Sequence, residues 1–182
     1  MMRKFGLIVA GFGGQGVLFV GQLLAHAAVI EGKQVAWIPS YGPEMRGGTA
    51  HCMVAIAERE ISSPLVEEPD AVMVFNRPSL DKFEPIIIKG GLLLVNSSMV
   101  DRPPVRRDLQ VYPIAANTLA EQLGNSRVAN MIMLGALVKL TGIVSIDSVL
   151  QALQQVLPEH RRDLLTLNQK ALELGAASFK VA

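Results

Sequence analysis

The stretch FGLIVAGFGGQG at residues 5–16 decides the fold, because a short apolar run leads there directly into a glycine-rich turn. Such an uninterrupted run is typical of a strand that is covered on both faces, as in a parallel sheet. The following residues are apolar nearly all round and predict a buried helix from about Gln15 to Ile30. Strand, glycine turn and helix in this order favour a layered α/β architecture.

The rest of the chain continues this pattern with short apolar strands first and helices afterwards. Strands are predicted at Gln34 to Ile38, Thr49 to Ala57, Ala71 to Phe75, Leu92 to Val95 and Val111 to Ile114. Helices are predicted near Ser79 to Phe83, Asn117 to Leu123, Arg127 to Leu140, Ile146 to Leu157 and Arg161 to Ala177. The sequence therefore indicates a single domain, residues 1–182, with a three-layer Rossmann-like α/β fold, a mostly parallel sheet and a helical C-terminal third.

Composition narrows the classes of partner. The 182 residues carry 17 basic and 16 acidic side chains, a net charge of +1 without a long run of either sign. This balance argues against a nucleic-acid partner. Charged residues make up only 18% and apolar residues 50% of the chain. Because ordinary soluble domains hold about 25% charged residues, we expect part of the apolar excess to face a partner protein.

Metal and membrane sites are not indicated. Cys52 is the single cysteine, so this chain alone can hold neither a conventional zinc site nor an iron–sulfur cluster. The three histidines show no ligand spacing, and no metal site is expected. The N-terminus imitates a signal peptide, but glycines interrupt its apolar run, and no window holds about 18 uninterrupted apolar residues. We therefore expect a cytoplasmic protein without a membrane contact.

The first candidate binding segment is the glycine turn from Gly11 to Gly16, which contains G-x-G-x-x-G between a strand and a helix. Glycines let the backbone approach a ligand closely, and unpaired amides at a helix start attract phosphate or carboxylate groups. The alternative is a tight turn that holds only water. A dinucleotide site would also need a carboxylate about 20 residues later, and the second strand ends without one. The turn also lacks the Gly-Lys-Ser/Thr of a nucleotide triphosphatase.

The second candidate segment is the loop from Ser40 to Gly48, which mixes glycines with an aromatic and two opposite charges. The Arg46 guanidinium could bind a phosphate or carboxylate group, and Glu44 could orient the Arg46 side chain. The alternative is a surface ion pair between these two side chains, worth under about 1 kcal/mol. Both candidate segments leave from carboxyl ends of strands, so they should lie side by side at the ligand edge of the sheet.

Together these segments carry a family resemblance. The motif G-x-G-G-Q-G followed by S-Y-G-P-E-M-R-G-G-T resembles the gamma subunit of 2-oxoacid:ferredoxin oxidoreductases, the family of pyruvate, 2-oxoglutarate and ketoisovalerate enzymes. Later positions are also similar to the family pattern, namely Asn130, the run Leu134 to Leu137, Asn168, Ala171 and Gly175. The resemblance covers nearly the whole chain.

The resemblance implies a role inside a larger enzyme. Enzymes of this family convert a 2-oxoacid and coenzyme A to acyl-CoA and reduce ferredoxin, using thiamine diphosphate and iron–sulfur clusters held by alpha, beta and often ferredoxin-like delta subunits. A gamma subunit would line the channel for coenzyme A and would not be active alone. The residues expected to contact coenzyme A are Gly11, Gly13, Gly14, Gln15, Gly16, Tyr41, Glu44, Arg46, Gly47 and Gly48. Catalytic residues are not assigned.

Two other interpretations remain open from the sequence. One is a free-standing dehydrogenase that binds NAD at the glycine turn. The absence of a carboxylate at the end of the second strand argues against this interpretation. The other is a pure assembly subunit whose glycine segments contact protein and no ligand.

Overall fold

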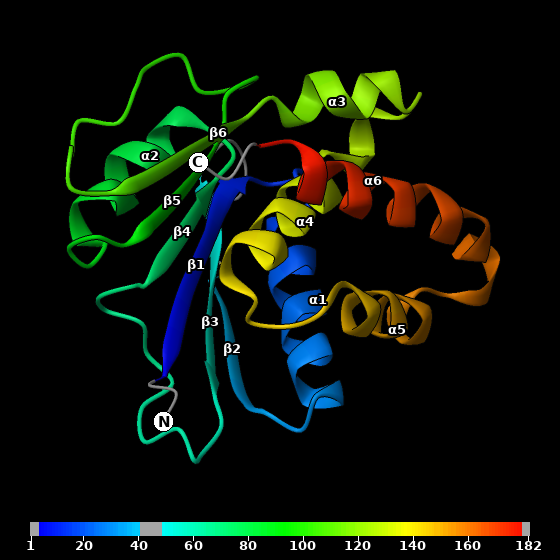
Figure 1. The fold of residues 1–182 in the computed structure, drawn as a ribbon, viewed down its shortest axis with the longest axis horizontal. Helices are drawn as coiled ribbons and strands as arrows, with labels where there is room; N and C mark the ends of the chain where they lie inside the picture. The colour runs from blue at the N-terminus through cyan, green and yellow to red at the C-terminus, as the bar shows by residue number, and fades with distance from the viewer. Residues whose placement is uncertain (1–3, 41–48, 180–182) are drawn as a thin grey trace.

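The computed structural model describes residues 4–40 and 49–179 (Figure 1). Six strands form one sheet in the order β2-β3-β1-β4-β5-β6. Their bounds are β1 (Phe5–Phe12), β2 (Gln34–Ser40), β3 (Thr49–Ala57), β4 (Ala71–Val74), β5 (Leu92–Asn96) and β6 (Gln110–Ile114). All five strand pairs lie within this single sheet, so the described chain forms one α/β domain.

Helices follow the glycine turn and fill the C-terminal third. The α-helices are α1 (Val17–Ile30), α2 (Arg77–Phe83), α3 (Ala116–Gln122), α4 (Ala129–Thr141), α5 (Ile146–Val156) and α6 (Leu165–Ala177). Short 3₁₀ helices are η2 (Glu84–Ile86), η3 (Ser126–Val128) and η4 (Glu159–Leu164). Each predicted strand and helix is present, with ends that differ by a few residues.

Strand direction gives a mixed sheet. β1, β4, β5 and β6 pair in parallel, whereas β3 is antiparallel to both of its neighbours, β1 and β2. The prediction of a mostly parallel sheet is confirmed, with β3 as the strand that runs the other way. Its first residue, Thr49, lies opposite Phe12 at the end of β1.

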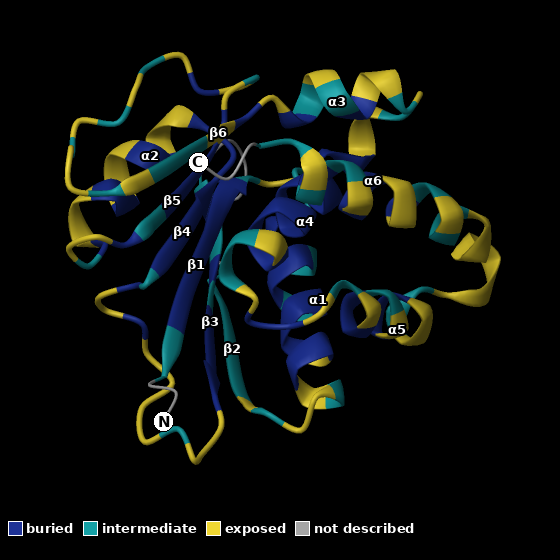
Figure 2. Cartoon of the chain, in the orientation of Figure 1, coloured by how far each residue is buried: buried dark blue, intermediate teal, exposed yellow. Residues whose placement is uncertain are grey.

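Two apolar cores cover the two faces of the sheet, as the alternation along β1 shows. Leu7 and Val9 belong to the core under α1, α3, α4, α5 and α6, whereas Ile8 and Ala10 belong to the core under α2. All four side chains are fully buried. Figure 2 shows the resulting buried strip along the sheet between the helices. The predicted three-layer arrangement is confirmed.

The contact between α4 and α6 brings two helix backbones unusually close. Gly135 of α4 faces Leu172 of α6, and Gly175 of α6 faces Ile132 of α4. A Cβ atom at Gly135 would lie 2.0 Å from the carbonyl oxygen of Leu172, and one at Gly175 would lie 1.9 Å from that of Ile132. This close approach requires glycine at both positions, because any side chain would push the two helix backbones apart.

The loop before β6 is anchored on one buried carboxylate. Glu84, whose side chain is 4% exposed, accepts hydrogen bonds from the backbone amides of Val105 and Arg106. Its other oxygen lies 3.3 Å from the Arg102 guanidinium, which also pairs with Asp81. Arg106 in turn pairs with Asp108. Two arginines of this loop are therefore engaged in fixing its path.

Glu31, directly after α1, gives the stability of the domain a defined pH dependence. Its carboxylate accepts hydrogen bonds from Lys33 at 2.8 Å and from the Ser145 amide at 2.6 Å, which joins the end of α1 to the start of α5. Partial burial alone would raise the pKa of Glu31, but these hydrogen bonds lower it from 4.5 to about 2. We expect stability to be retained above pH 4.5 and to fall between pH 4.5 and 2, because protonation then favours the unfolded chain.

Urea unfolding of wild type and Glu31→Gln over this pH range measures the contribution. The difference between the two proteins should be largest above pH 4.5 and should shrink as the pH approaches 2. An equal difference at all pH values would show that the charge of Glu31 does not contribute.

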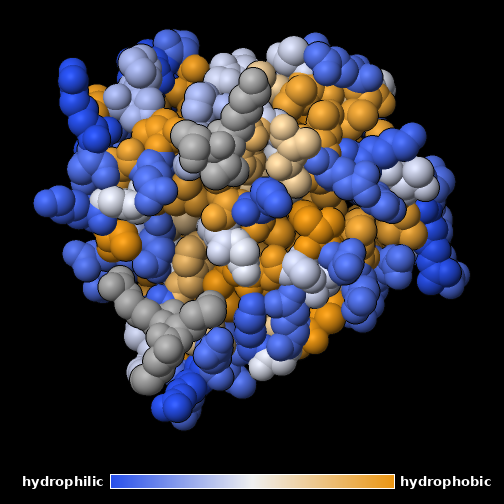
Figure 3. All heavy atoms as spheres, viewed as in Figure 1, coloured by the Kyte–Doolittle hydropathy of each residue, from blue (hydrophilic) through white to orange (hydrophobic). Residues whose placement is uncertain are grey.

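Apolar side chains also reach the surface. In Figure 3 they gather in the middle of the face seen in Figure 1, and hydrophilic residues dominate the outline of the molecule. No helix among residues 4–40 and 49–179 has the length and apolar character needed to cross a membrane.

Candidate functional site

The glycine turn lies at the carboxyl edge of the sheet and is closed by Gln15. The Gln15 side chain accepts a hydrogen bond from the Phe12 amide at 2.6 Å and donates one to the Phe75 carbonyl at 3.4 Å. It therefore ties the turn after β1 to the end of β4. Both polar atoms of the Gln15 side chain form hydrogen bonds within the chain and shape the turn, and its contact with a ligand stays a prediction.

Gly11 and Gly16 are fixed by close packing. A Cβ atom at Gly11 would lie 2.9 Å from side-chain carbons of Phe75 and Val17. Gly16 has a φ of 76° and lies against Asn130, whose Nδ2 would be 2.4 Å from a Cβ atom there. Because left-handed backbone and a close neighbour coincide at Gly16, other residues are excluded.

Gly13 and Gly14 are exposed at the tip of the same turn. A Cβ atom at Gly14 would have no neighbour within 4 Å. The helix that follows, α1, has no side-chain cap and no acidic residue in its first turn. Its first amides therefore present partial positive charge next to an open backbone, an arrangement that suits an anionic group.

A small polar pocket, here called the edge pocket, opens beside this turn. Its volume is about 210 Å³, and it is lined by Gly14, Gln15, Phe75, Asn96, Asn117, Ser126, Arg127, Ala129 and Asn130. The residues come from the ends of β1, β4 and β5 and from the helical segment that follows. Carboxyl ends of parallel strands are where α/β sheets bind ligands. The lining contains one guanidinium group and no carboxylate, so it favours an anion.

Asparagines organise the far wall of the edge pocket. The Asn96 side chain donates a hydrogen bond to Asn117 at 2.8 Å and accepts one from the Ser98 amide at 3.3 Å. The hydrogen bond between Asn96 and Asn117 fixes the start of α3 next to the end of β5. Asn96 and Asn117 were not among the residues predicted from the sequence. The available signal was the position of Asn96 directly after an apolar parallel strand.

The second predicted loop falls largely outside the described residues. Tyr41, Glu44, Arg46, Gly47 and Gly48 belong to that part of the chain. The described residues on either side of it lie at the carboxyl edge of β1, since Thr49 is opposite Phe12 and Ser40 is opposite His51. The contact between the two candidate segments themselves stays a prediction.

Comparison with known proteins identifies the family. Residues 6–178 match the family model described as pyruvate ferredoxin/flavodoxin oxidoreductase. The chain belongs to this family. Within it, the chain is 39% identical over 176 residues to the ketoisovalerate oxidoreductase subunit VorA of Methanothermobacter marburgensis. That alignment covers 96% of this chain and 36% of VorA, so the chain spans about a third of this longer relative.

Solved structures of the family agree with the fold. The gamma subunit of a keto/oxoacid ferredoxin oxidoreductase from Geobacter sulfurreducens is 32% identical, with a TM-score of 0.86 and 97% of each chain covered. A 2-oxoglutarate:ferredoxin oxidoreductase from Magnetococcus marinus, solved with 2-oxoglutarate, coenzyme A and succinyl-CoA, is 23% identical with a TM-score of 0.89. The alignment covers all of this chain and 32% of the Magnetococcus protein. At this identity the similarity shows that the two share a fold. The resemblance to gamma subunits is thereby confirmed.

Proposed function

We propose that this chain is the gamma subunit of a 2-oxoacid:ferredoxin oxidoreductase that works in the cytoplasm with alpha, beta and ferredoxin-like delta subunits. The enzyme would convert a 2-oxoacid and coenzyme A to acyl-CoA and carbon dioxide while reducing ferredoxin. The observation that carries the proposal is the similarity along 97% of both chains to the Geobacter gamma subunit. Thiamine diphosphate and iron–sulfur clusters would be held by the partner subunits.

Within that enzyme, the carboxyl edge of the sheet would line the route of coenzyme A. Three features support this assignment: the uncapped start of α1, the exposed backbone at Gly13 and Gly14, and the edge pocket with Arg127. All three suit a phosphate or carboxylate. Arg46, from the sequence motif of the second loop, would add a further guanidinium group. The coenzyme A in the Magnetococcus protein supports the choice of ligand.

The function is tested by purification of the tagged chain from its own cells without oxygen. We expect thiamine-diphosphate and iron–sulfur subunits to co-purify, together with dye reduction that depends on a 2-oxoacid and coenzyme A. A panel of oxoacids then identifies the substrate. A chain that elutes alone and without activity would contradict the proposal.

Arg46→Ala should raise the KM for coenzyme A of the assembled enzyme about 10- to 100-fold, because one charge-assisted hydrogen bond to a ligand contributes about 1.5–3 kcal/mol. The KM for the 2-oxoacid should stay unchanged. Steady-state kinetics with each substrate varied in turn measures both values.

A matched control is Arg59→Ala, which removes the same charge from the exposed segment after β3, near the amino edge of the sheet. It should leave both constants unchanged. An unchanged KM for coenzyme A in Arg46→Ala would remove Arg46 from the site. If the glycine turn also proved insensitive, the domain would be an assembly subunit without ligand contact.

The alternative of a free-standing NAD dehydrogenase gains no support. β2 runs Gln34–Ser40 and carries no carboxylate to hold a ribose hydroxyl. The relatives and solved structures described above are oxidoreductases named for ferredoxin or for 2-oxoacids.

A further inference from the structure

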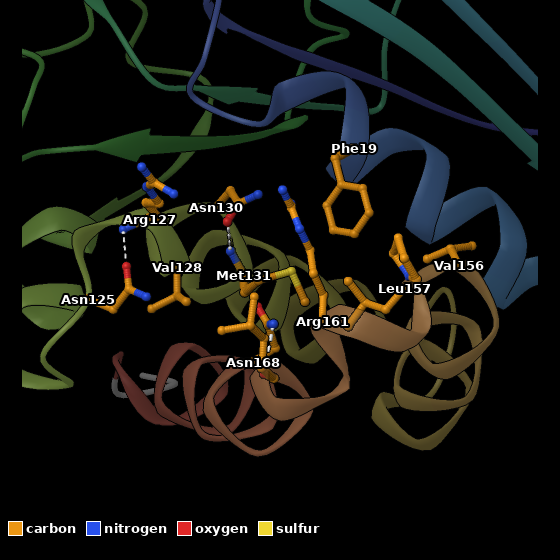
Figure 4. Close-up of a pocket in the computed structure, with 12 residues that line it drawn as sticks. Phe19, Asn125, Arg127, Val128, Asn130, Met131, Val156, Leu157, Arg161 and Asn168 are labelled. Atoms are coloured by element: carbon orange, nitrogen blue, oxygen red, sulfur yellow. Dashed lines mark hydrogen bonds between the residues drawn. The ribbon is translucent and has the colours of Figure 1, made fainter.

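An apolar hollow lies on each face of the sheet. The hollow on the helical face lies between α1, α4 and the segment from α5 to α6, and its volume is about 410 Å³ (Figure 4). Two asparagines in its wall are bonded to helix backbone, since Asn130 accepts a hydrogen bond from the Met131 amide and Asn168 donates one to the Leu164 carbonyl. The hollow on the other face, here called the β6 groove, lies beside the last strand of the sheet.

The β6 groove is formed by the end of the sheet and by the segment that leads from β5 to β6. Its volume is about 460 Å³, and most of its lining is apolar: Val95, Val100, Pro103, Pro104, Val111 and Pro113. Gln110 and Ile114 form backbone hydrogen bonds on the β5 side, so Pro113 lies at a position that faces the open edge of the sheet. Because proline has no amide proton, a further strand would pair poorly there. The groove is therefore suited to side chains.

The segment between β5 and β6 is fixed along α2 and η2. The Arg102 guanidinium pairs with Asp81 of α2, and the Asp108 carbonyl accepts a hydrogen bond from the Gly90 amide at 3.1 Å. Between these two points, the buried Glu84 holds two backbone amides of the segment. In Figure 1 the segment forms the outer margin of the molecule on the side away from α5 and α6. A partner that binds such a fixed segment loses little free energy in ordering it.

Large apolar side chains are exposed on this fixed segment and beside it. Val105 is 75% exposed, the largest exposed fraction among the large apolar side chains of the described chain, and Ile86 of η2 is 39% exposed. The Val105 amide donates to Glu84, two residues before Ile86, so the two side chains belong to one surface. We call Ile86, Val105 and the β6 groove together the loop surface. Apolar side chains on a rigid backbone are typical of contacts between proteins.

The loop surface is also positively charged. Residues 77–89 and 97–109 hold six basic and four acidic side chains, a net charge of +2, compared with +1 for the whole chain. Each of the four carboxylates pairs with an arginine of the same two segments, namely Asp81 and Glu84 with Arg102, Asp101 with Arg77, and Asp108 with Arg106. The exposed side chains of Lys82, Lys89 and Arg107 have no carboxylate of the described residues within 4.0 Å. These three cations are available to a partner.

We propose that the loop surface docks an acidic face of another protein in the assembly that this chain forms. Carboxylates of that protein would pair with Lys82, Lys89 and Arg107, and one of its apolar side chains would enter the β6 groove. A second copy of this chain fits less well, because a two-fold contact through this surface would bring positive charge against positive charge. The inference rests on the proposed function only in expecting an assembly.

Coupling of carboxylates to amines by a carbodiimide tests the contact in the assembly purified from its own cells. Because this reagent adds no spacer, mass spectrometry then identifies groups that touch. We expect Lys82 and Lys89 to be joined to Asp or Glu residues of another protein, and high salt to abolish these links. Lys170, which is exposed on α6, is the internal control and should form no such link.

The outcomes separate this proposal from the proposed function. Thiamine-diphosphate and iron–sulfur subunits that co-purify without links to Lys82 or Lys89 would contradict the docking surface alone. Links from these lysines to a second copy of the chain would replace the acidic partner by a homodimer and so refute the proposal. A chain that elutes alone would contradict both inferences.

Charge reversal measures the contribution of the loop surface. The double variant Lys89→Glu and Arg107→Glu should raise the dissociation constant between the full chain and the linked protein about 10-fold or more, and Val105→Asp should have a similar effect. Lys170→Glu is the control and should leave the constant unchanged. All of these side chains are exposed, so circular dichroism should show the unfolding midpoint of wild type.

Rescue distinguishes a direct contact from an indirect effect. Replacing the linked carboxylates of the partner by lysine should restore its binding to the double variant and weaken its binding to wild type. Equal affinity of wild type and the double variant for the partner, or a failure of this charge exchange, would overturn the proposal.

Discussion

Gly135→Ala should lower the midpoint of thermal unfolding by roughly 6–12 °C, which corresponds to about 3 kcal/mol for a domain of this size. Alanine normally stabilises a helix by about 1 kcal/mol relative to glycine. Here the new methyl group would lie 2.0 Å from the Leu172 carbonyl oxygen, so α4 and α6 must separate. That separation weakens the packing of Leu172, which is fully buried. Calorimetry or circular dichroism measures the midpoint.

Gly175→Ala should have a similar effect, since it meets the Ile132 carbonyl at 1.9 Å. Gly124→Ala is the control. Gly124 has a φ of 79° and open space around it, so it tests backbone strain without a clash and should cost only about 1 kcal/mol. Midpoints of Gly135→Ala and Gly175→Ala at or above that of wild type would show that the helices do not meet as described.

Glu84→Ala should destabilise the domain by about 3 kcal/mol, the second largest effect that we expect. The substitution leaves the amides of Val105 and Arg106 without their acceptor and removes the buried partner of Arg102. Unfolding in urea measures the loss. Proteolysis should also cut the loop before β6 sooner than in wild type, because that loop loses its anchor.

Asp81→Ala provides the comparison, since Asp81 pairs with the same Arg102 but its side chain is 50% exposed. Exposed ion pairs contribute about 0–1 kcal/mol, so this change should be small. Similar losses in the two variants would indicate that the ion pair matters more than the two backbone amides that Glu84 holds.

Much of the fold could be predicted from the sequence, because buried strands and helices leave long apolar patterns. The runs Leu7 to Ala10 and Ala71 to Val74 are buried on both faces, which made them recognisable as central strands. Strand direction is not encoded in such a pattern, and so the antiparallel course of β3 could not be derived. The structural role of Gly135 and Gly175 was equally hidden, because it depends on contacts with Leu172 and Ile132, which lie far from them in the sequence.

The candidate site was only partly predictable. The glycine turn was found because its motif is local, and the structure places Gly11 to Gly16 at the expected edge. The sequence motif includes Gln15 but does not show that its side chain forms hydrogen bonds to Phe12 and Phe75, which depend on the packing of β4 beside the turn. Asn130 and Asn168 line one pocket although they lie 38 positions apart, and no spacing rule joins them before the helices are packed.

The glycine contact between α4 and α6 also has a consequence for biosynthesis. Ten consecutive residues of α4, Ala129 to Val138, are buried, and α6 covers part of them. A ribosome delivers α6 after every other described element, so the nascent chain must hold a partly uncovered apolar helix until α6 emerges. Folding of such a domain is completed late, and intermediates with exposed apolar surface are prone to aggregate. Translation that stalls before residue 165 would therefore leave a product that depends on chaperones.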